Sequence, residues 1–171
     1  MRKLFKMTFK NDDRKFDNNG NLKLGFLVEY IFVAMVKKYL LQTLDWDVEI
    51  ITEDDINYEI SKLKNNLRTF ISNQFNGICL EFHKYTNYTP DLILINHVLR
   101  TIIVIDVTTD PNKIQQKQKY QIYAWLLSRY YGYNNVCVVV AYFEEGNLDS
   151  AQLYLNYIVG VLSRRLPAID L

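Results

Sequence analysis

Residues 89–108 read TPDLILINHVLRTIIVIDVT, and this stretch decides the fold that we expect for the chain. Two short apolar runs, 92–95 and 101–105, are joined by a turn over 96–100, which predicts a buried β-hairpin. Asp91 enters the hairpin beside a turn-forming proline, and Asp106 leaves it at the end of the second strand. Because the two acids end adjacent strands, we expect their carboxylates to converge on one point.

Two convergent carboxylates favour a divalent cation. Their hard oxygen ligands suit Mg²⁺ or Mn²⁺, which usually take one or two protein carboxylates and leave other positions to water and substrate phosphate. That ligand set is typical of a site that cuts phosphodiester bonds. Taken singly, Asp91 also fits a turn after proline and Asp106 a strand end before a helix cap. The other candidate residues favour the metal site.

The size and composition of the chain fit one soluble, intracellular domain. Its 171 residues allow a folded chain to bury about 70% of its unfolded surface. The net charge is only +1, but the arm over residues 1–20 is basic and could track phosphates or simply solubilise the terminus. The longest apolar stretch, 24–36, is too short to span a membrane, and no signal pattern precedes it. Cys79 and Cys137 lie in apolar runs and predict buried thiols.

The pattern of apolar residues predicts an α/β (α+β) fold, with a mixed central sheet flanked by helices. We expect one domain over 1–171, with its core over 24–143 and a C-terminal helix over 147–165. Asn147 or Asp149 would cap that last helix. The other expected elements are helices over 24–44, 53–73 and 111–131, a short edge segment over 45–51, and strands over 78–82 and 136–142.

The helix from Pro111 starts directly after the strand that ends at Asp106, so its first turns should lie beside the two acids. We expect Lys119 to orient the attacking water or to stabilise the phosphate, although an exposed lysine would have the same local pattern. Lys113 and Lys117 should lie off that face. Helical geometry puts Gln116, Lys119, Tyr120 and Tyr123 on one face and turns Ile114, Ile122, Trp125 and Leu126 toward the sheet.

Glu29 is the third acidic candidate. It lies among apolar helix residues, where a carboxylate needs a partner, and a bound cation is one such partner. A glutamate at the rim of the helix is the alternative. The acids between 45 and 55 fit a solvated segment, of which an early member could supply a further ligand. No pair of histidines has metal-ligand spacing, and no phosphate-binding glycine loop is present.

Pro90-Asp91 followed by Asp106-Val107-Thr108 resembles the motif of the PD-(D/E)XK nuclease superfamily, with Thr108 in the usual lysine position. The stretch GFLVE, ending at Glu29, resembles the G-x-x-x-E helix of archaeal Holliday-junction resolvases. The resemblance implies a restriction-endonuclease-like αβββαβ core. It also implies that Glu29, Asp91 and Asp106 hold the metal and that the backbone carbonyl of Val107 completes the shell.

Two branches of the superfamily compete. The stretch YAWLL, residues 123–127, resembles the segment after the motif in RecB-like nucleases, which carry glutamine where this chain has Lys119. The order of the TPD and IDVT motifs and Lys119 also resembles the cap-snatching endonuclease domain of segmented negative-strand RNA virus polymerases. In that domain the lysine is often displaced onto the next helix, and a histidine often stands where this chain has Glu29.

We therefore predict a divalent-metal-dependent endo- or exonuclease acting on DNA or RNA, in the cytoplasm or in a virus-infected cell. One alternative is a cap-snatching RNA endonuclease of a viral polymerase. A nuclease-like fold without activity, which binds nucleic acid or serves in assembly, is another, and Thr108 keeps it open. A homodimer is also left open. The predicted catalytic residues are Glu29, Asp91, Asp106 and Lys119, and the predicted nucleic-acid contacts are Gln116, Lys117, Tyr120, Tyr123 and Thr108.

Overall fold

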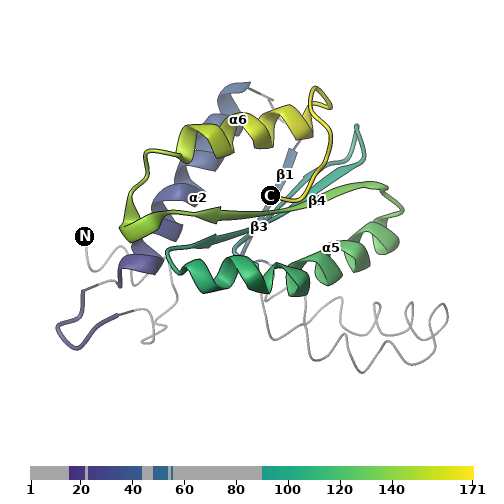
Figure 1. Cartoon of the computed structure of the whole chain (residues 1–171). Coiled ribbons are helices and arrows are strands. Elements are labelled where there is room, and N and C mark those ends of the chain that lie inside the picture. The colour runs from purple at the N-terminus through teal and green to yellow at the C-terminus, as the bar shows by residue number, and fades with distance from the viewer. Residues whose placement is uncertain (1–15, 22, 44–47, 54, 56–89) are drawn as a thin grey trace, which may run out of the picture.

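The computed structural model describes residues 16–21, 23–43, 48–53, 55 and 90–171 (Figure 1). The predicted helix over 53–73 lies outside these residues apart from its first positions, and the predicted strand over 78–82 lies wholly outside them. The elements are α2 (Leu24–Thr43), β1 (Val48–Thr52), β2 (Leu92–Asn96), β3 (Thr101–Thr108), the 3₁₀ helix η3 (Pro111–Gln116), α5 (Lys117–Tyr131), β4 (Asn135–Tyr142), the 3₁₀ helix η4 (Glu144–Gly146) and α6 (Ala151–Leu162).

The described strands form one mixed sheet in the order β1-β2-β3-β4. β1 pairs antiparallel with β2, β2 pairs antiparallel with β3, and β3 pairs parallel with β4. Every residue of β2 and β3 is buried, as expected for Ile-, Leu- and Val-rich central strands that are covered on both faces. The predicted mixed sheet with flanking helices is confirmed. The more specific restriction-endonuclease-like core stays a prediction.

Helices cover both faces of the sheet (Figure 1). Alternate residues of each strand point to opposite faces, so one face of β2 packs beneath α2 and α6 and the other packs on α5. The α2 and α6 side holds Phe32 and Phe143, whose ring centroids lie 5.2 Å apart. This packing fixes α2 across the sheet and so determines where its polar residues point.

Two element boundaries differ from the sequence prediction. The segment after Pro111 begins as the 3₁₀ helix η3, and the α-helix starts only at Lys117. The last helix starts at Ala151 and ends at Leu162, and neither Asn147 nor Asp149 caps it. The Asn147 carboxamide oxygen accepts the Asp149 N–H at 2.9 Å, which closes a local turn before the helix.

The face that α5 turns to the sheet also differs from the prediction. Tyr120 and Tyr123 are buried against β2, β3 and β4, whereas Ile114 and Trp125 are 41% and 37% exposed. Tyr120, Tyr123, Ala124 and Leu127 follow one another at helical spacing, and their apolar bodies make the stripe that packs on the sheet. The sequence prediction puts Tyr120 and Tyr123 on the face of Lys119, away from the sheet. Leu126, which it turns toward the sheet, is buried.

No helix in the described part of the chain is both long enough and apolar enough to cross a membrane.

Candidate metal centre

Asp91 and Asp106 meet at the open end of the β2–β3 hairpin. The register pairs Leu92 with Ile105, so Asp91 stands beside the end of β3. The Asp91 N–H donates to the Ile105 carbonyl at 3.1 Å, and the Val107 N–H donates to Asp91 Oδ2 at 2.7 Å. These two bonds hold the Asp91 side chain against the strand that carries Asp106. The convergence expected from residues 89–108 is therefore present in the structure.

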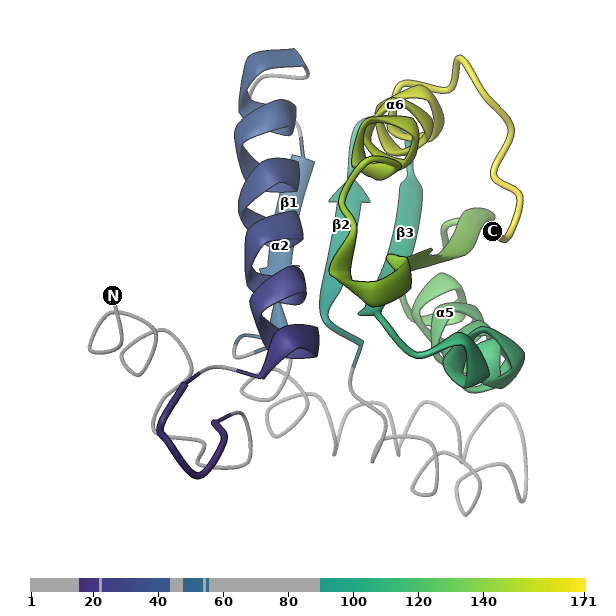
Figure 2. The same ribbon diagram turned by 60° about the vertical axis from the view of Figure 1, so that its left-hand side comes forward.

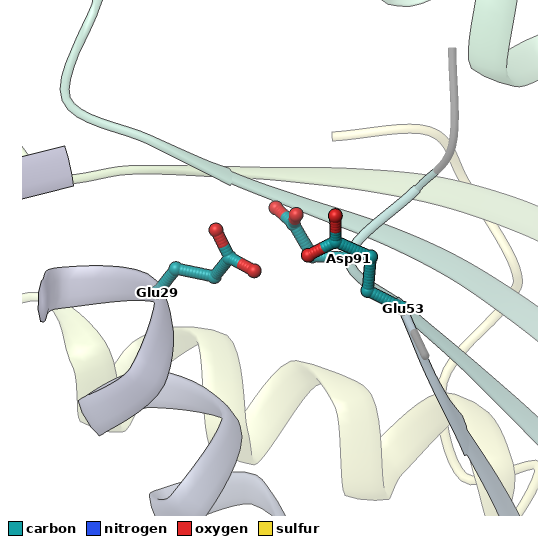
Figure 3. Close-up of side chains that lie close together, drawn as sticks. All are labelled: Glu29, Glu53 and Asp91. Carbon is teal, nitrogen blue, oxygen red and sulfur yellow. The ribbon is translucent and has the colours of Figure 1, made fainter. Parts of the chain in front are cut away.

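Glu29 reaches the same point from α2 (Figure 3). One carboxylate oxygen from each of Glu29, Glu53 and Asp91 lies within 4.8 Å of the others. Glu29 is only 7% exposed. Gly25, one helical turn earlier, lies beside the turn after β3, where an added Cβ would stand 3.6 Å from Thr109 Oγ1. Because Gly25 has no side chain, the first turn of α2 lies close to the turn after β3, and this places Glu29 over the end of the sheet.

Glu53 is a site residue that the sequence analysis missed. The sequence predicts that it belongs to the solvated acids between 45 and 55, but Figure 3 shows it pointing to Asp91 from the end of β1. The register explains its position, because Thr52 pairs with Leu92 and Glu53 is the next residue. The Thr52 N–H and Oγ1 both donate to Asp55 Oδ2, at 3.2 and 2.8 Å, which fixes the turn. The sequence feature that could have indicated Glu53 as a site residue is its position directly after a strand.

Crowding and burial make the carboxyls hard to ionise together. Burial raises the pKa of Asp91 well above its usual value, and the charges of Asp106 and Glu29 raise it further. Burial also raises the pKa of Asp106, against the effects of the Asp91 carboxyl and of Lys113. Asp106 is 3% exposed, and its Oδ2 has no hydrogen-bond partner in the structure as described. A buried acceptor of this kind needs a cation or a proton.

Two lysines act on the Asp106 carboxylate. Burial lowers the pKa of Lys119, while the charge of Asp106 raises it and that of Lys113 lowers it. Lys119 Nζ lies 5.0 Å from the ring centroid of Tyr120. The charges of Lys113 and Lys119 both lower the pKa of Asp106. Lys113 belongs to the 3₁₀ helix η3 and Lys119 to the first turn of α5. The prediction that Lys113 lies off the acid face stays a prediction.

The charge of Lys117 lowers the pKa of the buried Cys137 thiol on β4, although burial, the largest effect, raises that pKa. Tyr120 is 3% and Tyr123 7% exposed, and the pKa of each phenol is raised first by burial. Their predicted contact with nucleic acid stays a prediction, as does that of Lys117. The side chain of Gln116 lies outside the described part of the structure.

Thr108, in the usual lysine position of the motif, is 4% exposed. Its Oγ1 accepts the Asp110 N–H at 3.0 Å, and its carbonyl accepts the Phe143 N–H at 2.9 Å. Asp110 in turn caps η3 by accepting the Asn112 N–H at 3.0 Å. Thr108 therefore closes the turn that carries the chain from Asp106 toward Lys113, and its predicted contact with nucleic acid stays a prediction. The Val107 side chain packs in the core.

No family model matches the chain, and neither curated proteins nor solved structures give a match. The resemblance of the motifs to those of PD-(D/E)XK nucleases stays a prediction from the sequence.

Proposed function

We propose that the chain is a divalent-metal-dependent nuclease of the PD-(D/E)XK type. The observation that carries the proposal is the convergence of Glu29, Glu53 and Asp91 within 4.8 Å, next to the buried Asp106. Each of the three acids in that group comes from a different element: Glu29 from α2, Glu53 from the end of β1 and Asp91 from the start of β2 (Figure 3). Like charges gathered in this way are costly unless a cation neutralises them.

The donor set suits Mg²⁺ or Mn²⁺. The cluster offers carboxylate oxygens, the ligands that hard cations prefer, and the unpartnered Oδ2 of Asp106 is a further oxygen beside it. Glu29, Glu53, Asp91 and Asp106 are the residues that would hold the ion or ions. Bound there, a divalent ion would lower the pKa of a water molecule and neutralise the charge of a phosphate.

The lysines complete the proposed site. Lys113 and Lys119 both act electrostatically on Asp106, so positive charge lies on the side of the cluster that faces η3 and α5. A lysine in that position orients an attacking water or stabilises the charge that builds up on a phosphate. The lowered pKa of Lys119 also brings it nearer to the range in which a lysine exchanges protons. The displaced lysine of the proposal is thus Lys119, with Lys113 as a second cation.

A catalytically inactive nuclease-like fold is the second candidate. Thr108 favours it, because a buried threonine that closes a turn replaces the lysine of the motif. Under this reading the lysines beside Asp106 only balance its charge. The two candidates predict different behaviour with the same metal, which makes them separable by one assay.

The test is a cleavage panel of single-stranded, double-stranded and branched DNA alongside RNA, with Mg²⁺, Mn²⁺ or a chelator. The protein, Asp91→Asn and the control Asp149→Asn are compared, because Asp149 is an exposed acid in the loop before α6. We expect metal-dependent cleavage by the wild type and the control and none by Asp91→Asn. Cleavage of RNA alone would favour the cap-snatching branch. If no substrate is cut with either ion, the result rejects the active nuclease and supports the inactive nuclease-like fold.

A further inference from the structure

A polar cavity lies at the end of the sheet opposite to the carboxylate cluster. Its volume is about 780 Å³, and its lining residues belong to the β2–β3 turn, the α5–β4 turn and the segment after α6. Figure 1 shows these three segments at the same end of the sheet. β3 begins at Thr101 beside this cavity and ends at Thr108 near the carboxylates. A strand of that length spans roughly 25 Å. The lining residues are Arg100, Gly132, Asn134, Asn135, Arg164, Arg165, Leu166 and Pro167.

The cavity is strongly basic. Arg100, Arg164 and Arg165 line it, and no acid is among the lining residues. In the described part of the chain, their hydrogen bonds go to neutral partners. Arg100 donates to the Gly132 carbonyl at 3.3 Å, and Arg165 Nε donates to Ser163 Oγ at 2.9 Å. The Arg100 guanidinium also lies 5.4 Å from the ring centroid of Tyr133. These contacts orient the guanidinium groups without neutralising their charge.

The end of α6 does not account for the arginines. Cationic side chains often follow a helix because they bind its last carbonyls. Here those carbonyls have other donors. The Leu162 carbonyl accepts Asn96 Nδ2, and the Gly160 carbonyl accepts the Leu166 N–H, both at 2.9 Å. The Val159 and Val161 carbonyls accept the backbone N–H groups of residues 163 and 164. No guanidinium is required for capping.

Backbone conformation does not account for them either. Arg100 and Arg164 have φ values of +54° and +56°, in the left-handed region that favours glycine or asparagine. A turn selected only for its shape would carry one of those residues. Two arginines held there, on two different loops of the same cavity, point to a role for their side chains.

We propose that this cavity binds the phosphate groups of an anionic ligand. Guanidinium forks pair with phosphate oxygens through two parallel hydrogen bonds, and the side-chain amide of Asn134 adds a neutral donor. A cavity of about 780 Å³ has room for a ligand of the size of a nucleotide. The phosphates belong either to a small diphosphate compound or to a nucleic-acid backbone. The proposal holds whether or not the carboxylate end cuts nucleic acid.

Calorimetric titration of the whole chain in metal-free buffer tests this proposal. Pyrophosphate and a 20-nucleotide single-stranded DNA are the two probes. The arginine variants leave the carboxylate end unchanged, so only the binding that these variants lose is assigned to the cavity. The variants are Arg100→Gln and the double variant Arg164→Gln with Arg165→Gln. Glutamine removes the charge but keeps a polar, unbranched side chain, and it leaves the φ preference unchanged, as glycine would not. The control is Lys37→Gln with Lys38→Gln, exposed residues of α2 that do not line the cavity.

We expect binding of pyrophosphate or of the DNA that weakens at least tenfold in each arginine variant, the loss that removal of a charged hydrogen bond produces. The lysine control should stay within twofold. Pyrophosphate binding assigns the cavity to a small ligand, and binding of DNA alone assigns it to a backbone. Absence of binding for both probes at millimolar concentration overturns the proposal, and so does binding that the arginine variants leave unchanged. If Arg100→Gln fails to fold, the double variant Arg164→Gln with Arg165→Gln, which lies in an exposed loop, tests the proposal alone.

Discussion

Replacement of Asp91 by asparagine should stabilise the metal-free protein and remove its response to metal. Asparagine keeps the shape of the side chain, and its oxygen can still accept the Val107 N–H that Asp91 Oδ2 accepts at 2.7 Å. The substitution therefore removes charge and little else. It isolates the electrostatic cost that the cluster imposes when no cation is bound.

The size of the effect follows from the geometry. Asp91 has carboxylate oxygens of Glu29 and Glu53 within 4.8 Å. At an effective dielectric constant of 20, two full charges at that separation repel by about 3.5 kcal/mol, so the two pairs together amount to about 7 kcal/mol when all three groups are charged. Protons held by the carboxyls relieve most of this repulsion. We expect a net gain of about 2 kcal/mol at pH 8, or about 4–8 °C in the unfolding midpoint.

The gain should depend on pH. The pKa of Asp91 is raised, first by burial and then by Asp106 and Glu29, so the folded state binds this proton more tightly than the unfolded state. Its contribution to stability is then fully present below the unfolded pKa, about 3.9, and is lost as the pH rises through the raised pKa. The variant and the wild type should differ little near pH 4 and increasingly as the pH rises to 8.

Thermal unfolding from pH 4 to 8, with and without Mn²⁺, measures both effects. Wild-type protein should gain about 2.7 kcal/mol at 100 times the dissociation constant of the ion, and Asp91→Asn should gain almost nothing. Asp149→Asn is the control and should behave as wild type. The reasoning is refuted if Asp91→Asn is destabilised without metal at pH 8 and keeps the wild-type shift with Mn²⁺.

Three further predictions follow from the site. Glu53→Gln should weaken Mn²⁺ binding at least tenfold without lowering the metal-free unfolding midpoint. An unchanged Mn²⁺ affinity in calorimetry would show that Glu53 is a solvated acid and not a metal ligand. Lys119→Ala should lower the cleavage rate about 10²-fold and Lys113→Ala about tenfold, with Mn²⁺ affinity within a few fold; wild-type rates in both would exclude the displaced lysine. Thr108→Val should lower the free energy of unfolding by about 1 kcal/mol, because the Asp110 N–H loses its acceptor; urea unfolding measures this, and an unchanged midpoint would contradict it.

Local sequence patterns were enough for the elements at the centre of the fold. The runs over 92–95 and 101–105 consist almost wholly of Ile, Leu and Val, and such runs can only be buried strands or helix cores. The turn between the two runs and the proline before the first one favour strands over a helix. Gly132 ends α5 as predicted, with φ at +71°. These features depend on neighbours in the sequence, which is why they could be inferred.

The misses come from interactions between distant segments. Glu53 joins the site only because Thr52 pairs with Leu92, and nothing in the sequence near Glu53 encodes that pairing. The segment Pro111–Gln116 is a 3₁₀ helix, and the apolar spacing around it does not distinguish 3₁₀ from α. The buried face of α5 was misassigned because tyrosine suits either face, and the sheet beneath the helix decides.

The central claim, that these carboxylates bind a divalent cation, is tested most directly by anomalous X-ray diffraction from crystals soaked in Mn²⁺. The account predicts an anomalous peak in contact with the carboxylate oxygens of Glu29, Glu53 and Asp91, with Asp106 at or beside it, and no such peak in crystals of Asp91→Asn. Well-diffracting wild-type crystals without anomalous density at this cluster, at Mn²⁺ concentrations in the millimolar range, would contradict it.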